Sequence, residues 1–447
     1  MFQNVKEGCS RFFDFLPQDK KYIWIFFIIS AIFLVVCVAV WGIFDVRNDV
    51  YLYFEYATNI FNGQMPFKDF TFEYPPFMIP FIIIPSIFTS DLQTYCILFS
   101  IMVLLFFLIG VVFLLKIAKP FDSTNKRILI FAILTLVMTN VFLFARNDIF
   151  PVVICIIGIY FYLQKKYDYA WIMMAIGAMT KLFPILFLPV FLIPLLVKRD
   201  YRNAVRGILL SLAVAVIISL PFIISDISTA FDYLSYHTDR GIQIESVASS
   251  IILFVNMFSP GLAHISFSHA SHSIEGPLPD AVEPFIMYLL LVAVLAFILW
   301  LFVALKRKKE SMEHEDLKKI TIFAGIIMVM IFLTFNKVFS AQFVIWVLML
   351  VAITQIQLFG MEQRNRILII ATIYAIISFF CGAFYQEITE LNSIMVTLLF
   401  VRNMLHIFFT GYLVHLLVRS INNLSPEGKE VGVRALVQDL RQKILRS

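Results

Sequence analysis

The sequence predicts an all-α, polytopic membrane protein with about twelve transmembrane helices, and composition is the first observation behind this. Of 447 residues, 61% are hydrophobic and 15% are charged, and the mean hydropathy is +0.89. Soluble domains have roughly 45–50% apolar and about 25% charged residues. The apolar residues also form blocks of roughly 17–25, the length of helix that spans about 30 Å of hydrocarbon. A soluble protein would need many fully buried helices without a polar face, so that class is disfavoured.

The apolar blocks place the transmembrane helices along the chain. We expect them at residues 22–44, 94–118, 128–144, 149–164, 168–180, 182–197, 204–225, 284–305, 320–335, 341–358, 366–383 and 393–418. The segment from Tyr74 to Phe88 is also apolar, but four prolines interrupt it. We expect a re-entrant or interfacial helix there, because a full span would invert the charge pattern of every later loop. The same interpretation suits Val247 to Phe258.

Charged residues in the connections predict the orientation in the membrane. Alternate connections are basic, at the N-terminus and at 116–127, 165–166, 198–206, 306–309, 364–366 and 419–447. By the positive-inside rule these connections, and both termini, face the cytoplasm. The basic residues occur in short runs beside spans, so membrane lipids are expected partners and a nucleic acid is not.

This orientation divides the chain into three parts. They are a cytoplasmic N-terminus (1–21), a transmembrane domain (22–418) and a cytoplasmic tail (419–447). The tail contains one basic helix, from Val433 to Leu445, that we expect at the membrane surface. The non-cytoplasmic side then carries two long connections, a first outer loop at 45–93 and a larger outer loop at 226–283.

The first outer loop combines carboxylates with many aromatic residues. Its acids are Asp45, Asp49, Glu55, Asp69 and Glu73. Any one of them could be a solvated loop charge. The density of Tyr and Phe predicts a packed loop, however, and packed carboxylates need partners or shifted pKa values. A carboxylate in such a place can act as a general base.

Three cations lie on this same predicted side, against the positive-inside bias. Arg146 is two residues from Asp148 between apolar blocks, and Lys181 and Lys337 occupy similar short turns. They could pair with Asp49 and Asp148 as structural salt bridges. They could instead bind an anionic ligand such as a lipid phosphate, for which Arg and Lys have suitable charge and geometry.

Metal and nucleotide sites are weakly indicated. The larger outer loop contains His237, and His264, His269 and His272 follow with a spacing that is weak evidence for a metal in a polar loop. The five cysteines have no metal-like spacing and mostly lie in apolar blocks, which is typical of inert buried thiols. The sequence has no phosphate-binding loop and no dinucleotide fingerprint. We therefore expect neither a cofactor nor a metal.

Three groups of motifs resemble a known class of enzymes. The first outer loop contains DVY at 49–51, YA at 56–57, GQMPFKDF at 63–70 and EYPP at 73–76. RNDIFP at 146–151 leads to MTKLFP at 179–184, and NKVFSAQF at 336–343 leads to Trp346. Together these motifs resemble GT-C membrane glycosyltransferases, and most closely the polyprenol-phosphate-mannose-dependent α-1,2-mannosyltransferase-like family. The likeness in organisation covers roughly residues 40–350.

The resemblance implies an activity and a set of roles. Members take a sugar from a polyprenyl-phosphate donor on the non-cytoplasmic face, and an acid of the first outer loop is the base. The matching residue is Asp49, with Asp45 as its rival. Asn48 removes an Asp-x-Asp pair, which weakens the case for a metal, and Ala341 stands where the family often has Pro.

The expected function is transfer of a hexose, with mannose implied by the resemblance, to a glycolipid or glycan hydroxyl with inversion. Arg146, Lys181 and Lys337 are the expected donor-phosphate residues. The expected sugar or acceptor contacts are Tyr51, Glu73, Tyr74, Asp148, His237, Asn336 and Gln342, with Trp346 as a further packing residue. For the aromatic residues, core packing is an equal alternative. A lipid-linked sugar flippase, or another transporter, is the alternative function, although a transporter more often carries charge near the middle of its spans.

Overall fold

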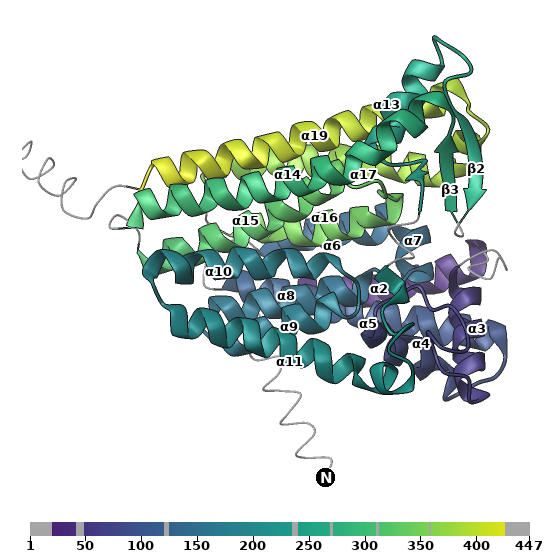
Figure 1. Ribbon diagram of the computed structural model, residues 1–447, viewed down its shortest axis with the longest axis horizontal. Coiled ribbons are helices and arrows are strands. Elements are labelled where there is room, and N and C mark those ends of the chain that lie inside the picture. The colour runs from purple at the N-terminus through teal and green to yellow at the C-terminus, as the bar shows by residue number, and fades with distance from the viewer. Residues whose placement is uncertain are drawn as a thin grey trace, which may run out of the picture.

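The described part of the chain is almost entirely helical. The computed structural model describes residues 20–41, 49–119, 125–234, 240–268, 271–309, 313–356 and 359–424. Most helices lie side by side with their axes along the long dimension of the molecule (Figure 1). Asp45 and His237, the tail helix expected from Val433 to Leu445, and His269 lie outside the described residues.

Within the described residues, seven helices are long and apolar enough to cross a membrane. They are α2 (Lys20–Trp41), α5 (Leu92–Ala118), α11 (Tyr201–Ser225), α14 (Pro277–Arg307), α15 (His314–Phe335), α17 (Met361–Ala383) and α19 (Ser393–Asn422). Each coincides with an expected span. This confirms the predicted fold class of a helical, multi-pass membrane protein.

The other five expected spans are formed by shorter helices, so the number twelve stays a prediction. These elements are α6 (Asn125–Met138) with α7 (Asn140–Ala145), α8 (Ile149–Leu163), α9 (Tyr167–Ala178), η3 (Phe183–Leu186) with α10 (Phe187–Lys198), and η5 (Ala341–Phe343) with α16 (Val344–Val351) and η6 (Ala352–Gln355). The single helix expected at 128–144 is wrong. It breaks at Thr139, whose hydroxyl donates to the carbonyl of Thr135 at 2.6 Å, a contact that often bends helices.

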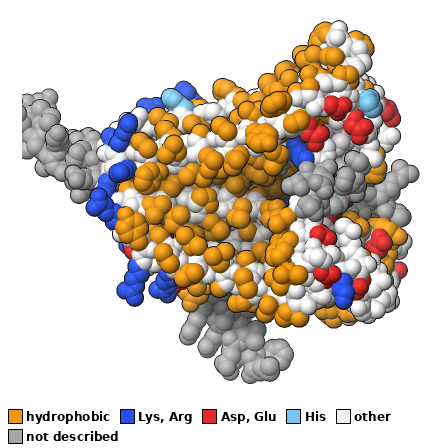
Figure 2. Space-filling model, in the orientation of Figure 1, with side chains coloured by type: hydrophobic (Ala, Val, Ile, Leu, Met, Phe, Trp, Pro, Cys, Tyr) orange, Lys and Arg blue, Asp and Glu red, His pale blue; other side chains and the backbone are white. Residues whose placement is uncertain are grey.

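The burial of the long helices separates the protein core from the lipid-facing surface. In the most apolar window of α15, 83% of residues are buried, against 17% in α11 and 22% in α14. Side chains such as Leu209, Ile217 and Leu295 are therefore exposed on α11 and α14. Apolar side chains cover the middle of the visible face (Figure 2). A helix that is apolar all round is stable in this position only with lipid around it.

The two ends of the bundle differ in charge and in structure. Lys and Arg side chains gather at one end and Asp and Glu at the other (Figure 2). The acidic end holds α3 (Asp49–Phe61), α4 (Ile79–Ser86) and α13 (Val247–Asn256) (Figure 1). Helix η1 (Pro76–Met78) directly precedes α4, and α18 (Tyr385–Thr389) contacts the larger outer loop through Tyr385 and His272. The helices at 76–86 and 247–256 are short, as expected for the two segments interpreted as interfacial.

A small sheet lies in the larger outer loop, which the all-α prediction missed. Strands β1 (Ile242–Gln243), β3 (Ser271–Glu275) and β2 (His264–Ser268) pair antiparallel in the order β1-β3-β2. Helix α14 begins at Pro277, earlier than the expected start at 284. Strands β2 and β3 are five residues each, and tertiary pairing decides such short segments more than propensity does.

Candidate functional site

The candidate site lies at the acidic end, where several turns between helices meet α3. Asp49 is the first residue of α3, where the positive end of the helix dipole favours a carboxylate. Its side chain forms an ion pair with Arg146, which follows α7. The two side chains are 29% and 27% exposed, so a ligand can reach both. The structure thus brings together the predicted base and one predicted phosphate residue.

A second acid–cation pair follows directly along the chain. Asp148 is fully buried, and its Oδ1 lies 2.6 Å from the Lys181 Nζ. The same oxygen accepts a hydrogen bond from the indole of Trp346 at 2.7 Å. The Trp346 ring is stacked between Phe183 and Phe343, with ring centroids 4.1 Å away on each side. Asp148 therefore fixes Lys181, and its burial favours a supporting role over the expected contact with sugar.

The tripeptide Arg146–Asn147–Asp148 connects the two pairs. Lys181 Nζ lies 3.5 Å from the side-chain oxygen of Asn147 as well as contacting Asp148. Burial lowers the pKa of Arg146, and the negative charges of Asp148 and Glu245 oppose that change. Arg146 thus lies in the field of three carboxylates, counting its partner Asp49, and Arg stays protonated in proteins.

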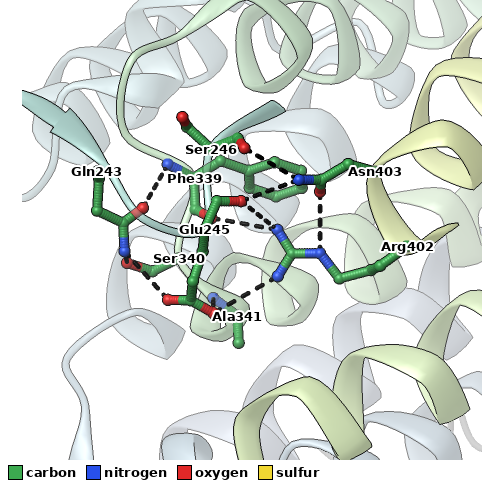
Figure 3. Close-up of polar contacts among 8 residues, drawn as sticks. All are labelled: Gln243, Glu245, Ser246, Phe339, Ser340, Ala341, Arg402 and Asn403. Atoms are coloured by element: carbon green, nitrogen blue, oxygen red, sulfur yellow. Dashed lines mark hydrogen bonds and ion pairs between the residues drawn. The ribbon is translucent and has the colours of Figure 1, made fainter. Parts of the chain in front are cut away.

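A third cluster, around Glu245 of the larger outer loop, was not predicted from the sequence. Glu245 is 4% exposed and lies 3.5 Å from the guanidinium of Arg402, which is fully buried in α19. Gln243 and Asn403 complete a network of buried polar side chains (Figure 3). Burial raises the pKa of Glu245 against the opposing effect of Arg402. The available signal was Arg402–Asn403 inside an apolar span, where a charge demands a partner.

Lys337 lines a pocket at the start of α14. It is buried and forms an ion pair with Glu283 at 3.5 Å, in place of the expected Asp49 or Asp148. The pocket has a volume of about 440 Å³ and is lined by Asp280, Glu283, Pro284, Met287 and Lys337. Beyond Met287, α14 exposes a run of large apolar side chains. The pocket therefore lies beside the lipid-facing surface of that helix.

The remaining predicted contact residues differ in exposure. Tyr51 is 44% exposed, whereas Tyr74 is buried against Tyr53, with hydroxyl oxygens 3.4 Å apart. Burial raises the pKa of Tyr74. Core packing is thus the better description of Tyr74, which was the alternative left open for it. Half-buried positions are occupied by Glu73, Asn336 and Gln342.

The histidines of the larger outer loop have separate partners. His264 Nε2 lies 3.9 Å from Glu275 on the neighbouring strand. His272 Nδ1 lies 3.2 Å from the hydroxyl of Tyr385. Within the described ranges, no three His, Cys, Asp or Glu side chains converge in a way that could hold a metal ion.

Comparison with known proteins gives one family match. The sequence profile of glycosyltransferase family 87 matches residues 70–315, more than half of the chain. The matched region contains Arg146, Lys181 and Glu245, while Asp49 and Lys337 lie outside it. No protein of curated function matches the sequence.

Among solved structures, the chain is similar to ArnT from Cupriavidus metallidurans, in a crystal structure with bound undecaprenyl phosphate. The identity is 12% and the TM-score is 0.46, and the likeness covers 90% of this chain and 77% of that chain. The likeness is therefore extensive in length but distant.

Proposed function

Because this chain belongs to glycosyltransferase family 87, we propose that it transfers a hexose from a polyprenyl-phosphate donor to a hydroxyl group of a glycolipid or glycan. Family membership confirms the resemblance to membrane glycosyltransferases drawn from the motifs, and it decides against a transporter. The observation that carries the finer proposal is the accessible Asp49 carboxylate paired with Arg146, beside the buried Asp148–Lys181 pair.

The donor class follows from charge and surroundings. Arg146 and Lys181 place two cations on adjoining turns, and a phosphate is the ligand chemistry that guanidinium and ammonium groups favour. A polyprenyl tail suits a site at the end of an apolar helical bundle. The absence of a nucleotide-binding motif from the sequence agrees with a lipid-linked donor. Mannose as the sugar is supported by the motif resemblance alone.

The reaction can be written with its atoms balanced. The acceptor hydroxyl oxygen forms a bond to the anomeric carbon while Asp49 takes the hydroxyl proton. The bond between that carbon and the phosphate oxygen breaks, and its electron pair leaves with the polyprenyl phosphate. Attack from the opposite face inverts the anomeric centre through an oxocarbenium-like transition state.

The cations act on the leaving group. Negative charge grows on the phosphate as the bond breaks, so cations already in place stabilise the transition state more than the ground state. Asp148 is fully buried, and it holds Lys181 from the side opposite solvent. Arg146 is shared between Asp49 and the incoming phosphate, which frees the carboxylate to accept a proton.

The proposed orientation places this chemistry on the non-cytoplasmic face. The acidic end carries the site, and the basic end matches the positive-inside rule for the cytoplasm (Figure 2). Both termini are then cytoplasmic, with residues 1–21 and 419–447 outside the transmembrane domain at 22–418. Asp45 and His237 keep their proposed roles as rival base and acceptor contact.

A transfer assay tests the proposal. Purified protein in lipid nanodiscs receives a labelled polyprenyl-phosphate hexose and a mixed glycolipid acceptor. We expect Asp49→Asn to lower kcat by about 10²–10⁴-fold, the usual contribution of a general base. Glu55→Gln is the matched control, because Glu55 is an exposed acid of the same helix, α3.

Two results would contradict the proposal in different ways. Undiminished transfer by Asp49→Asn would remove this residue as the base and favour Asp45. No transfer with any lipid-linked donor, together with donor translocation across vesicle membranes, would reject the proposed reaction.

A further inference from the structure

The segment that carries Lys337 has no regular secondary structure and depends on a neighbouring segment for its hydrogen bonds. The amide of Gln243 donates to the carbonyl of Lys337 at 2.9 Å. The amide of Phe339 donates to the side-chain oxygen of Gln243 at 2.9 Å. The amide of Ala341 donates to the Glu245 carboxylate at 3.0 Å. Gln243 and Glu245 thus hold the segment at three alternate residues, Lys337, Phe339 and Ala341.

Two polar side chains of helix α19, Arg402 and Asn403, reach into this arrangement from the right of the view in Figure 3. Arg402 Nη2 donates to the carbonyls of Glu245 at 2.8 Å and Phe339 at 3.3 Å. Asn403 Nδ2 donates to the carbonyls of Glu245 at 3.1 Å and Ser246 at 3.0 Å. One guanidinium therefore contacts both segments, and we call Gln243, Glu245, Arg402 and Asn403 the clamp.

The energetics of the clamp favour a role in setting the backbone conformation of residues 337–341 over a role in raising the stability of the fold. Desolvating a buried ion pair costs about as much as the attraction returns, so apolar residues of similar volume would often be equally stable. A buried polar network whose groups pair in one arrangement does, however, disfavour other arrangements, because these would leave more buried groups without partners. The clamp defines the backbone path from Lys337 to the start of η5, and α16 beyond it carries Trp346.

Helix η5, which follows the Lys337 segment, packs against α7, the helix that ends just before Arg146. We propose that Glu245 and Arg402 are positioning residues that hold the backbone of residues 337–341 beside α7, so that the ammonium group of Lys337 can serve the phosphate of the lipid-linked donor together with Arg146. This inference rests on the proposed function. The clamp touches no substrate itself and acts through the backbone of residues 337–341. Displacing a substrate-positioning group by about 1 Å can lower a rate by about a hundredfold.

The alternative is that the clamp serves folding alone, and a double-mutant cycle distinguishes the two. The variants are Glu245→Gln, Lys337→Gln and the combination, assayed in nanodiscs with labelled polyprenyl-phosphate hexose. We expect each single variant to lower kcat/KM for the donor by about 10–100-fold, with the acceptor KM unchanged. The double variant should be no worse than Lys337→Gln, because both changes disable the same contact.

The positioning role would be overturned if the fold-losses in kcat/KM of the two single variants multiplied in the double variant. It would also be overturned if the acceptor KM rose as much as kcat/KM for the donor fell. An unaffected Lys337→Gln would also overturn it, while loss of transfer in Asp49→Asn would leave the proposed reaction standing. Glu362→Gln is the control, because Glu362 also pairs with an arginine, Arg366, but on the exposed surface of α17.

A second variant keeps the test decisive if Glu245→Gln does not fold. Gln243→Met leaves the Glu245–Arg402 pair intact and removes the side-chain acceptor for the Phe339 amide. The same non-additivity with Lys337→Gln is expected, and independent effects again reject the role.

Discussion

Replacing Asp148 by asparagine should leave Lys181 as a largely buried cation without its counter-ion. The two charged atoms are 2.6 Å apart, which corresponds to a gross attraction of about 6 kcal/mol at an effective dielectric constant of about 20. Breaking a buried pair costs about 3–5 kcal/mol of folding free energy. Lys181 is 17% exposed and can regain some water, so we expect a loss of about 2–4 kcal/mol. The asparagine oxygen can still accept from Trp346.

The assay is a double-mutant cycle with Lys181→Met, followed by denaturant unfolding in micelles. The double variant should recover most of the loss, with a coupling of about 2–3 kcal/mol. Asp168→Asn is the control, because Asp168 pairs with Arg206 at a similar distance, 2.5 Å, but with side chains 42% and 61% exposed. Such a pair contributes about 1 kcal/mol or less. A coupling below about 0.5 kcal/mol, or equal losses for the two asparagine variants, would refute the reasoning.

Two further predictions concern packing and pH. Gly207→Ala should destabilise the protein by about 1–3 kcal/mol, because the new Cβ would lie 2.3 Å from the Trp171 ring. The measurement is a lower Tm. Gly411→Ala is the control and should not lower the Tm, because a Cβ there would have nothing within 4 Å. Burial lowers the pKa of His272, so the folded state binds its proton less tightly and stability falls as the pH drops below about 6.5. His272→Gln should reduce the fall in Tm between about pH 7.5 and 5. An unchanged pH profile in His272→Gln would contradict this.

The helices were predictable because hydropathy is a property of consecutive residues. Every expected span falls on helical residues, either in one helix or in two or three consecutive shorter ones, since a block of apolar residues needs no distant partner to favour the hydrocarbon. The break at Thr139 was missed because a hydroxyl that bonds its own helix has no signature in an apolar block. The sheet was missed because β2 and β3 are five residues each, and their pairing supplies most of their stability.

The candidate site was predictable in part. Asp49, Arg146, Asp148 and Lys181 were singled out as acids and cations on one side, and the structure pairs them. The buried position of Glu245 was not predicted, because nothing beside it in the sequence indicates that a buried arginine 157 residues away will contact it.

The sequence by itself determined that this protein is a helical membrane protein with its acids and several unusual cations at one predicted face. Only the tertiary structure decided which charges meet. Asp148 and Trp346 are 198 residues apart in the chain and share a hydrogen bond, and Lys337 pairs with Glu283 rather than with the acids near Asp49. The physical reason is that transfer into lipid depends on local composition. The pairing of buried charges depends instead on how whole helices pack. Burying each charge costs desolvation free energy, and only a partner brought close by the folded arrangement offsets that cost.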